Sequence, residues 1–174
     1  GTLVALKARR SLFEELVRGY DGREFGSVGD SLMAEFASAV NAVLCALAIQ
    51  ERIAEENAAL PAAARMQLRI GVNLGDVIEE KGSVFGDAVN VAARLQALAK
   101  PGGVLIAGAV WEQVHLKVQA RYIAAGLREV KNIAEPVRTF EVLPPEPPGF
   151  AGRIAGVFAH VASRRVLRAV AIGI

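Results

Sequence analysis

Asp30 is the first residue of this chain whose type and setting suggest chemistry. It follows Gly29 between two segments that alternate as strands do, so we expect it at the tip of a hairpin. A carboxylate at such a tip is held rigidly and keeps its oxygens exposed. Magnesium prefers carboxylate oxygens and bridges them to phosphates. The alternative is that the Gly-Asp pair simply forms a turn.

Asn90 and Arg94 form a second candidate group. They lie four residues apart in the segment 88–99, which has helical spacing, so they should share one face of a helix. An amide and a guanidinium on one face can both reach one phosphorylated ligand, and phosphoryl chemistry depends mainly on positioning and charge stabilisation. The alternative is a solvated Asn-Arg pair on a surface helix.

The composition limits the functions that these residues could serve. The chain has 174 residues, 53% of them hydrophobic, which fits one domain with a sizeable core and a short extension. A net charge of +2 argues against a dedicated nucleic-acid surface. The single cysteine, Cys45, excludes an internal disulfide framework and permits a reducing compartment. No segment has the features of a signal peptide.

Helices and strands are predicted in alternation, with two hairpins that interrupt the alternation. The predicted helices cover residues 2–19, 38–57, 88–99 and 108–115. The predicted strands lie within 23–36 (two strands around a turn at 29–30), 66–72, 75–80 as the hairpin partner of 66–72, 104–106, 121–127 and 138–143, and the segment 82–87 is predicted as a loop. This pattern predicts an α+β fold, ferredoxin-like, with a mostly antiparallel sheet and helices on one face.

The chain divides into three parts by composition. Residues 1–143 hold the predicted domain, and residues 144–149 are a proline-rich linker. Residues 150–174 are apolar with four arginines, which predicts either a C-terminal helical extension or the start of a membrane segment. The apolar run in view is shorter than the ~20 residues that a span needs, so membrane attachment would depend on sequence beyond residue 174.

Three stretches together resemble the class III adenylyl/guanylyl cyclases, and bacterial adenylate cyclases in particular. They are residues 29–36 (GDSLMAEF), 68–77 (LRIGVNLGDV) and 85–95 (FGDAVNVAARL), and the closing segment 131–137 (KNIAEPV) is also similar. The resemblance runs from about residue 1 to residue 143 and implies the cyclase homology fold. Each stretch alone is weakly specific, but their order and spacing together are quite specific.

The resemblance also implies roles for individual residues. Asp30 corresponds to one of two aspartates that bind two Mg²⁺ or Mn²⁺ ions. Asn90 would orient the ribose, and Arg94 would stabilise charge on the α-phosphate during ring closure. Lys131 is similar in position to a lysine that contacts the triphosphate, and Arg128 is an alternative to it.

The implied protein is a homodimeric signalling enzyme with active sites between its subunits. It would convert ATP, or alternatively GTP, into the cyclic nucleotide and pyrophosphate. The implied location is the cytoplasm, either free or tethered to the cytoplasmic face of a membrane. The alternative is a catalytically inactive, cyclase-like module that dimerises or binds nucleotide for regulation.

The sequence departs from the family pattern at the metal site. Family members carry another metal-binding aspartate in a strand well before the Gly-Asp hairpin. Residues 1–29 contain only Asp21, which falls in a predicted turn. We therefore expect that first strand to lie before Gly1. Because one carboxylate rarely holds two metal ions, we expect the chain by itself to be inactive.

Two further departures concern the purine. Adenylyl cyclases often place a lysine three residues before Gly29, where this chain has Gly26, and an aspartate seven residues before Asn90, where it has Ser83. Gly26 offers only its backbone, and a serine hydroxyl makes few hydrogen bonds. The sequence therefore predicts weak discrimination between ATP and GTP, with ATP favoured by the overall resemblance.

Other residues with reactive side chains are assigned structural roles. His115 and His160 have no cysteine or second histidine at ligand spacing, so neither is predicted to bind a metal. Cys45 lies on an apolar stripe of the helix 38–57 and should pack in the core. Asp76 and Asp87 are predicted to belong to loops near the site.

Overall fold

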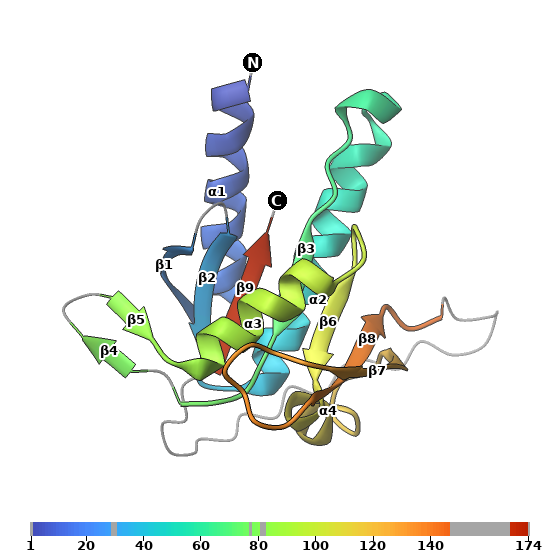
Figure 1. The fold of residues 1–174 in the computed structure, drawn as a ribbon. Coiled ribbons are helices and arrows are strands. Elements are labelled where there is room, and N and C mark those ends of the chain that lie inside the picture. The colour runs from blue at the N-terminus through green and yellow to red at the C-terminus, as the bar shows by residue number, and fades with distance from the viewer. Residues whose placement is uncertain (1, 29–30, 77, 81–82, 147–167, 174) are drawn as a thin grey trace.

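The structure is a computed structural model that describes residues 2–28, 31–76, 78–80, 83–146 and 168–173 (Figure 1). Its helices are α1 (Thr2–Gly19), α2 (Ala39–Ala58), α3 (Asp87–Leu98) and α4 (Gly108–Val114), with a 3₁₀ turn at Ala62–Ala64. Its strands are β1 (Gly22–Val28), β2 (Ser31–Phe36), β3 (Arg69–Val72), β4 (Ile78–Glu80), β5 (Ser83–Phe85), β6 (Val104–Ala107), β7 (Arg121–Arg128), β8 (Val137–Leu143) and β9 (Arg168–Gly173). All four predicted helices are present, with ends within two residues of the prediction.

One large sheet forms the centre of the molecule. Its seven strands run in the order β1-β2-β9-β3-β6-β8-β7. Every neighbouring pair is antiparallel except β3 and β6, which are parallel. The predicted α+β fold with a mostly antiparallel sheet is confirmed.

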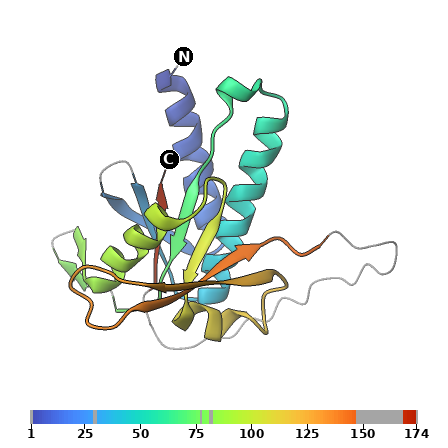
Figure 2. The same cartoon turned by 45° about the vertical axis from the view of Figure 1, so that its right-hand side comes forward.

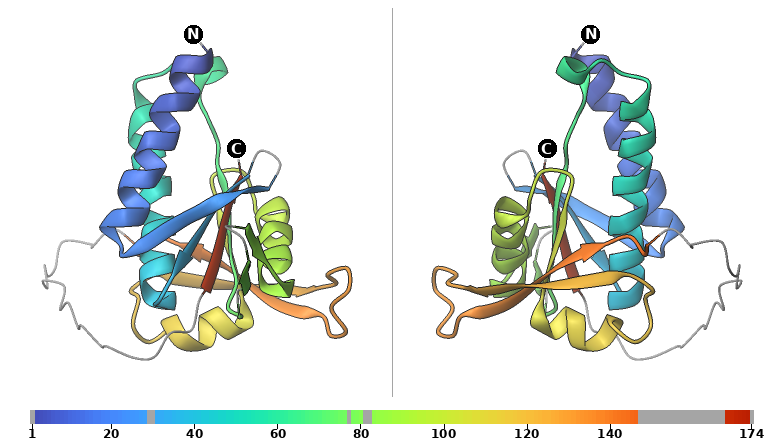
Figure 3. Two further views of the ribbon diagram at one scale, coloured as in Figure 1. Left: turned by 90° about the vertical axis from the view of Figure 1, so that its left-hand side faces the viewer. Right: turned by 90° about the vertical axis from the view of Figure 1, so that its right-hand side faces the viewer.

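Helices cover both faces of this sheet. α1 and α2 lie on one face, and α3 lies on the other (Figures 1 to 3). The prediction that all helices pack on one face was wrong. The reason is visible in β2, where Ser31 and residues 33–36 are all buried, so both faces of the strand need a covering layer.

The main core lies mostly between the sheet and the helices α1, α2 and α4, and Val91 and Leu95 of α3 also belong to it. Large side chains with almost no exposed surface fill it, among them Phe36, Ile49, Ile70 and Ile106. α2 begins where the hydroxyl of Ser38 accepts a hydrogen bond from the backbone N–H of Asn41, at 3.3 Å. Cys45 is buried in this core, as predicted, and burial raises the pKa of its thiol to about 12.

The hairpin predicted between 66–72 and 75–80 was wrong. β3 pairs with β6 on one side and with β9 on the other, so neither of its edges is open to residues 75–80. Instead β4 pairs with β5 in a small separate hairpin, with Glu80 opposite Ser83. The predicted loop at 82–87 therefore contains a strand, Ser83–Phe85. β4 and β5 pair only with each other in a two-stranded sheet, and such local pairing leaves little periodic signal.

Residues 168–173 form a central strand, whereas the sequence predicted a helical extension or the start of a membrane segment for residues 150–174. β9 pairs antiparallel with β2 and with β3, and Ile172 is in register with both Leu32 and Ile70. Without it the inner edges of β2 and β3 would present backbone groups with no partner. The other residues of the predicted extension, 150–167 and 174, lie outside the described residues. Within the described part of the chain, none of the helices has the length and hydropathy needed to cross a membrane.

Candidate active site

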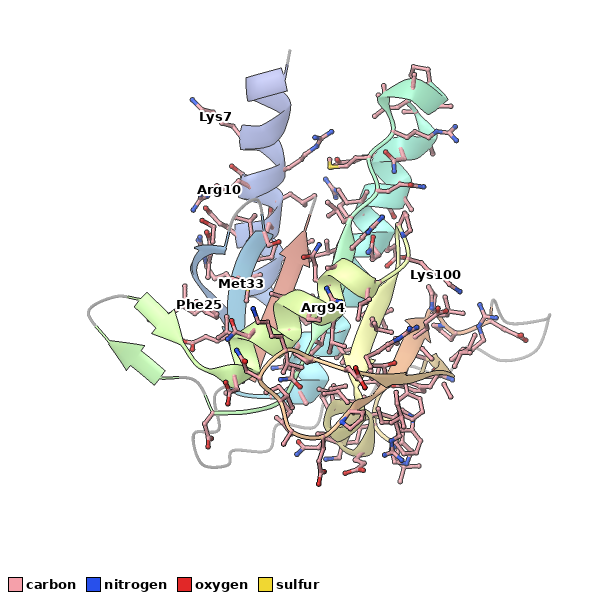
Figure 4. All side chains as sticks on the ribbon, viewed as in Figure 1. Lys7, Arg10, Phe25, Met33, Arg94 and Lys100 are labelled. Atoms are coloured by element: carbon pink, nitrogen blue, oxygen red, sulfur yellow. The ribbon has the colours of Figure 1, made fainter. Side chains whose placement is uncertain are left out.

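α3 presents Asn90 and Arg94 together. Its buried side chains form one continuous stripe against the sheet: Ala88, Val89, Val91, Ala92 and Leu95. Asn90 and Arg94 lie outside that stripe, and both are exposed. The shared exposed face predicted from their spacing is therefore present. Figure 4 shows Arg94 on α3, the helix that lies alone on its face of the sheet.

A glycine in β3 allows α3 to lie close to the sheet. A Cβ atom added to Gly71 would lie 2.3 Å from the backbone nitrogen of Gln96 and 2.4 Å from the carbonyl oxygen of Ala92. No larger residue fits there without moving the helix. Gly71 therefore fixes how near the exposed side chains of α3 sit to the strands below.

The hairpin that carries Asp30 is also tied to α3. Asp30 itself lies outside the described residues, but β1 and β2 flank it in an antiparallel pair. Ser31, the next residue, is buried, and its hydroxyl donates a hydrogen bond to Oε1 of Gln96 at 3.1 Å. Gln96 lies two residues after Arg94 on α3. The hairpin and the helix are thus held together within one chain.

The backbone conformation at position 26 accounts for the glycine there. It has a φ of 140° and follows an irregularity in β1, where Glu24 pairs with Ala34 but Gly26 pairs with Met33. This bulge leaves Phe25 unpaired in the ladder and turns it toward Met33 and α3. A lysine at this position would be strained. Ser83, the other predicted base-reading position, lies in β5, and its side chain is outside the described part of the structure.

Lys131 lies in the connection between β7 and β8. It is exposed, and the buried Val130 and partly buried Ile133 anchor the connection to the core. This connection is on the same side of the sheet as α3 (Figure 3). Arg128, the alternative cation, ends β7 and is also exposed. Both cations are exposed and belong to or border this connection, so the choice between them stays a prediction.

Glu35 is a buried carboxylate that the sequence analysis did not select. It is only 6% exposed. Its Oε1 atom accepts a hydrogen bond from Nε of Arg23 at 2.5 Å and pairs with a second nitrogen of the same guanidinium. Its Oε2 atom is buried, with no hydrogen-bond partner among the described residues. The available signal was a charged residue among the apolar residues Met33, Ala34 and Phe36.

The described residues do not assemble a metal site. Among them, no group of three or more histidine, cysteine, aspartate or glutamate side chains could hold a metal ion. β9 occupies the centre of the sheet beside β2, and its sequence, RAVAIG, contains no carboxylate. The resemblance assigns one of the two implied metal-binding aspartates to Asp30, and none of the described strands contains an aspartate that could be the other.

Comparison with known proteins identifies the family. Residues 2–142 match the adenylate and guanylate cyclase catalytic domain. The chain belongs to this family. The predicted resemblance is therefore confirmed, and residues 2–142 form a cyclase domain.

Curated relatives and solved structures agree with this assignment. The chain is 45% identical to the putative adenylate cyclase 3 of Rhizobium meliloti over 155 residues, which cover 86% of this chain and 26% of that protein. The chain thus spans about a quarter of the length of that relative. A crystal structure of an adenylate/guanylate cyclase/hydrolase from Silicibacter pomeroyi is 37% identical, with a TM-score of 0.77 over 82% of this chain and 85% of that one. The adenylyl cyclase CyaB from P. aeruginosa shares the fold, with 20% identity, a TM-score of 0.66 and coverage of 84% and 83%.

Proposed function

We propose that the protein containing this cyclase domain converts ATP into cyclic AMP and pyrophosphate in a signalling role. The observation that carries the proposal is the exposed pair Asn90 and Arg94, which share one face of α3, the helix that Gly71 allows to lie close to the sheet. ATP is the proposed substrate because two relatives, matched over 86% and 75% of this chain, are named putative adenylate cyclase 3 and adenylate cyclase 1. GTP is the competing substrate to be tested.

The proposed reaction is an intramolecular displacement. The ribose 3′ oxygen forms a bond to the α-phosphorus, the bond from that phosphorus to the bridging oxygen of the β-phosphate breaks, and pyrophosphate leaves. The hydroxyl proton passes to solvent or to a phosphate oxygen. Asn90 would hold the ribose so that its 3′ oxygen faces the phosphorus. The guanidinium of Arg94 would stabilise negative charge that develops on the α-phosphate oxygens.

Divalent metal ions are part of the proposal, since cyclases of this family use them. Asp30 is the residue of this chain that would hold Mg²⁺ or Mn²⁺, with two ions expected per site. The ions would lower the pKa of the 3′-hydroxyl and neutralise the leaving pyrophosphate. The second carboxylate is absent from β9, so we expect it from another part of the full-length protein. Lys131 would contact the triphosphate.

We further propose a homodimer, in which Asp30 of one chain faces Asn90 and Arg94 of the other. Each hairpin and each α3 would then serve different sites. The near-neutral charge offers no nucleic-acid surface, and we propose a cytoplasmic location, with any membrane contact made by sequence beyond residue 174.

A direct assay tests the proposal. Purified full-length protein with ATP and Mn²⁺ or Mg²⁺ should release cyclic AMP and pyrophosphate in equal amounts. Arg94→Ala should remove this activity while the circular dichroism spectrum stays unchanged, because Arg94 is exposed and outside the core. Arg69→Ala, an exposed arginine of β3, is the matched control and should keep activity. Product formation that is unchanged in Arg94→Ala would overturn the proposed role.

The alternative function is a regulatory module without catalysis. It is favoured by one observation, the absence of a carboxylate in the strand β9 beside β2. A module of this kind would bind ATP and dimerise but release no cyclic AMP under any metal condition. Nucleotide binding without product formation by the full-length protein would decide for this alternative.

A further inference from the structure

Glu35 combines two properties that rarely occur together. The residue is 6% exposed, and one of its two carboxylate oxygens has no hydrogen-bond partner in the described part of the chain. The other oxygen is fully engaged by Arg23. A buried acceptor without a donor is costly, and most buried polar atoms in folded proteins have a partner. Oε2 of Glu35 is therefore a vacant acceptor for a ligand that brings its own N–H group.

Strand geometry places this acceptor on the face of the sheet that α3 covers. Ser31, Met33 and Glu35 alternate along β2 and so point to one side. Ser31 bonds to Gln96 of α3, and Met33 packs against Val89 of α3. The residues that alternate with them, Ala34 and Phe36, point to the other side of the sheet and belong to the main core.

The neighbours of Glu35 on this face connect it with the proposed substrate. Met33 is paired with Gly26 and contacts Val89, which immediately precedes Asn90. Figure 4 shows Phe25 and Met33 on β1 and β2, near α3. Gly26 is one of the two positions that read the purine by resemblance, and Asn90 is the residue that would orient the ribose. Glu35 is the next residue after Met33 on the same face.

We propose that Glu35 is a specificity-determining residue for the purine, whose 6-amino group donates a hydrogen bond to Oε2. This inference rests on the proposed function. Gly26 has no side chain to occupy the space near Met33, so a base can approach this part of β1 and β2. Arg23, whose side chain is 52% exposed, pairs with Glu35 from the surface, so the base would approach Oε2 beside this guanidinium. Burial keeps bulk water away from Oε2 and leaves the amine with little competition.

The charge of the pair indicates which base edge fits. An ionised carboxylate only accepts hydrogen bonds, and a guanidinium only donates them. Adenine offers a donor at its 6-amino group next to an acceptor at N1, which matches a carboxylate beside a guanidinium. In the same orientation guanine presents an acceptor at position 6, which gives no hydrogen bond to the carboxylate, and its N1–H and 2-amino donors would have to shift along the edge to reach Oε2. A single such contact would discriminate only modestly between ATP and GTP. This agrees with the weak discrimination predicted from Gly26 and Ser83, which offer few contacts to the purine.

A double-mutant cycle between the protein and the substrate tests the inference. In the full-length protein, kcat/KM and equilibrium binding are measured for ATP and for purine riboside triphosphate, which lacks the 6-amino group. Wild type should favour ATP by about tenfold or more, because one charge-assisted hydrogen bond is lost with the analogue. Glu35→Met, which fills the same space without an acceptor, should show a ratio close to one. Glu35→Gln should fall between them, since its amide oxygen can still accept.

Glu24→Gln is the matched control. Glu24 lies on β1 and pairs with Arg10 of α1 on the opposite face of the sheet, so its removal should leave the ratio between the two nucleotides at the wild-type value. Thermal unfolding of each variant shows whether it folds. If Glu35→Met does not fold, Glu35→Gln alone must still lower the ratio.

The outcomes separate this inference from the proposed function. Cyclic AMP formation with the same ATP-to-analogue ratio in wild type and in the Glu35 variants overturns the inference and keeps the function. An equal loss for both nucleotides means that Glu35 only positions Arg23, and this also overturns it. Binding that shows the expected coupling without cyclic AMP formation supports the inference and rejects the cyclase function.

Discussion

The two faces of the central sheet are built from different kinds of contact. On the face covered by α1, α2 and α4, the buried side chains are almost entirely apolar, and they form one continuous core. On the face covered by α3, Val91 and Leu95 join this same core, and a second, small apolar cluster has Met33, Val89 and Ala92 at its centre. This second face also holds three buried polar side chains, Ser31, Glu35 and Asn73.

Hydrogen bonds connect this polar face to α3 and β1. Asn73 donates to the carbonyl oxygen of Ala88 at 3.2 Å, Ser31 bonds to Gln96, and Glu35 pairs with Arg23. Hydrogen bonds have directional requirements that apolar packing lacks. The comparison indicates that one face mainly supplies stability and the other positions the exposed residues of the proposed site. Substitutions on the two faces should therefore separate activity from stability.

The largest effect on activity is expected at Asp30. In the full-length protein, Asp30→Ala should abolish cyclic AMP formation, because a carboxylate that holds the metal ions would be lost. The unfolding midpoint should stay close to wild type. Asp21→Asn is the control, since Asp21 occupies a turn with a φ of 58° that asparagine also tolerates. Unchanged turnover in Asp30→Ala would contradict the proposal that Asp30 holds the metal ions.

The largest effect on stability is expected on the opposite face. Phe36 is 1% exposed and lies in the main core, so Phe36→Ala should lower the free energy of unfolding by about 3–5 kcal/mol. Urea denaturation followed by circular dichroism measures this change. At a temperature where the variant is still folded, its turnover per folded molecule should be near wild type. A folded Phe36→Ala protein without activity would contradict the division between the faces.

Mixed dimers test whether the Asp30 hairpin and α3 serve the same site across two chains. Asp30→Ala and Arg94→Ala homodimers should each be inactive. When the two chains are co-expressed, about half of the dimers are mixed, and each mixed dimer has one intact site of two, so activity should return to about a quarter of wild type. The measurement is cyclic AMP formation by dimers that carry two different affinity tags. Mixed dimers that form and remain inactive would rule out a shared interfacial site.

A smaller effect is expected at the β7–β8 connection. Lys131→Ala should raise KM for ATP by roughly tenfold to a hundredfold, because a charged contact to the triphosphate would be lost. Arg128→Ala should have little effect, although Arg128 is exposed at the start of the same connection. Steady-state kinetics on both variants compare them directly. The reverse result would assign the triphosphate contact to Arg128.

The smallest effect concerns the pH dependence of the main core. The pKa of the buried Cys45 thiol is raised from 9.0 to about 12, so the folded protein keeps this proton at a pH where the unfolded chain loses it. The thiol does not affect stability below pH 9, and above it stability falls by up to about 1.4 kcal/mol per pH unit. Cys45→Ala should show a shallower decline between pH 9 and pH 11 in urea denaturation. Equal slopes for both proteins would contradict a buried, protonated thiol.

Local patterns in the sequence were sufficient to predict most helices and strands of this fold. Helical spacing predicted α2 and α3, and a separation of four residues guarantees that Asn90 and Arg94 share a face of any α-helix. The Gly-Asp turn between alternating residues predicted the β1–β2 hairpin. The order and spacing of the motifs were also enough to indicate the cyclase family. These features depend on residues that are close together in the chain.

The tertiary structure decided what depends on distant residues. β9 is separated from its partners β2 and β3 by more than ninety residues of sequence, and its strand conformation is stabilised by pairing on both sides. The burial of Glu35 likewise requires α3 to cover the second face of β2, which alternation within β2 does not reveal. The φ of Gly26 arises from a bulge against β2. Sequence periodicity records which side of a strand a residue is on, but only packing determines what covers that side.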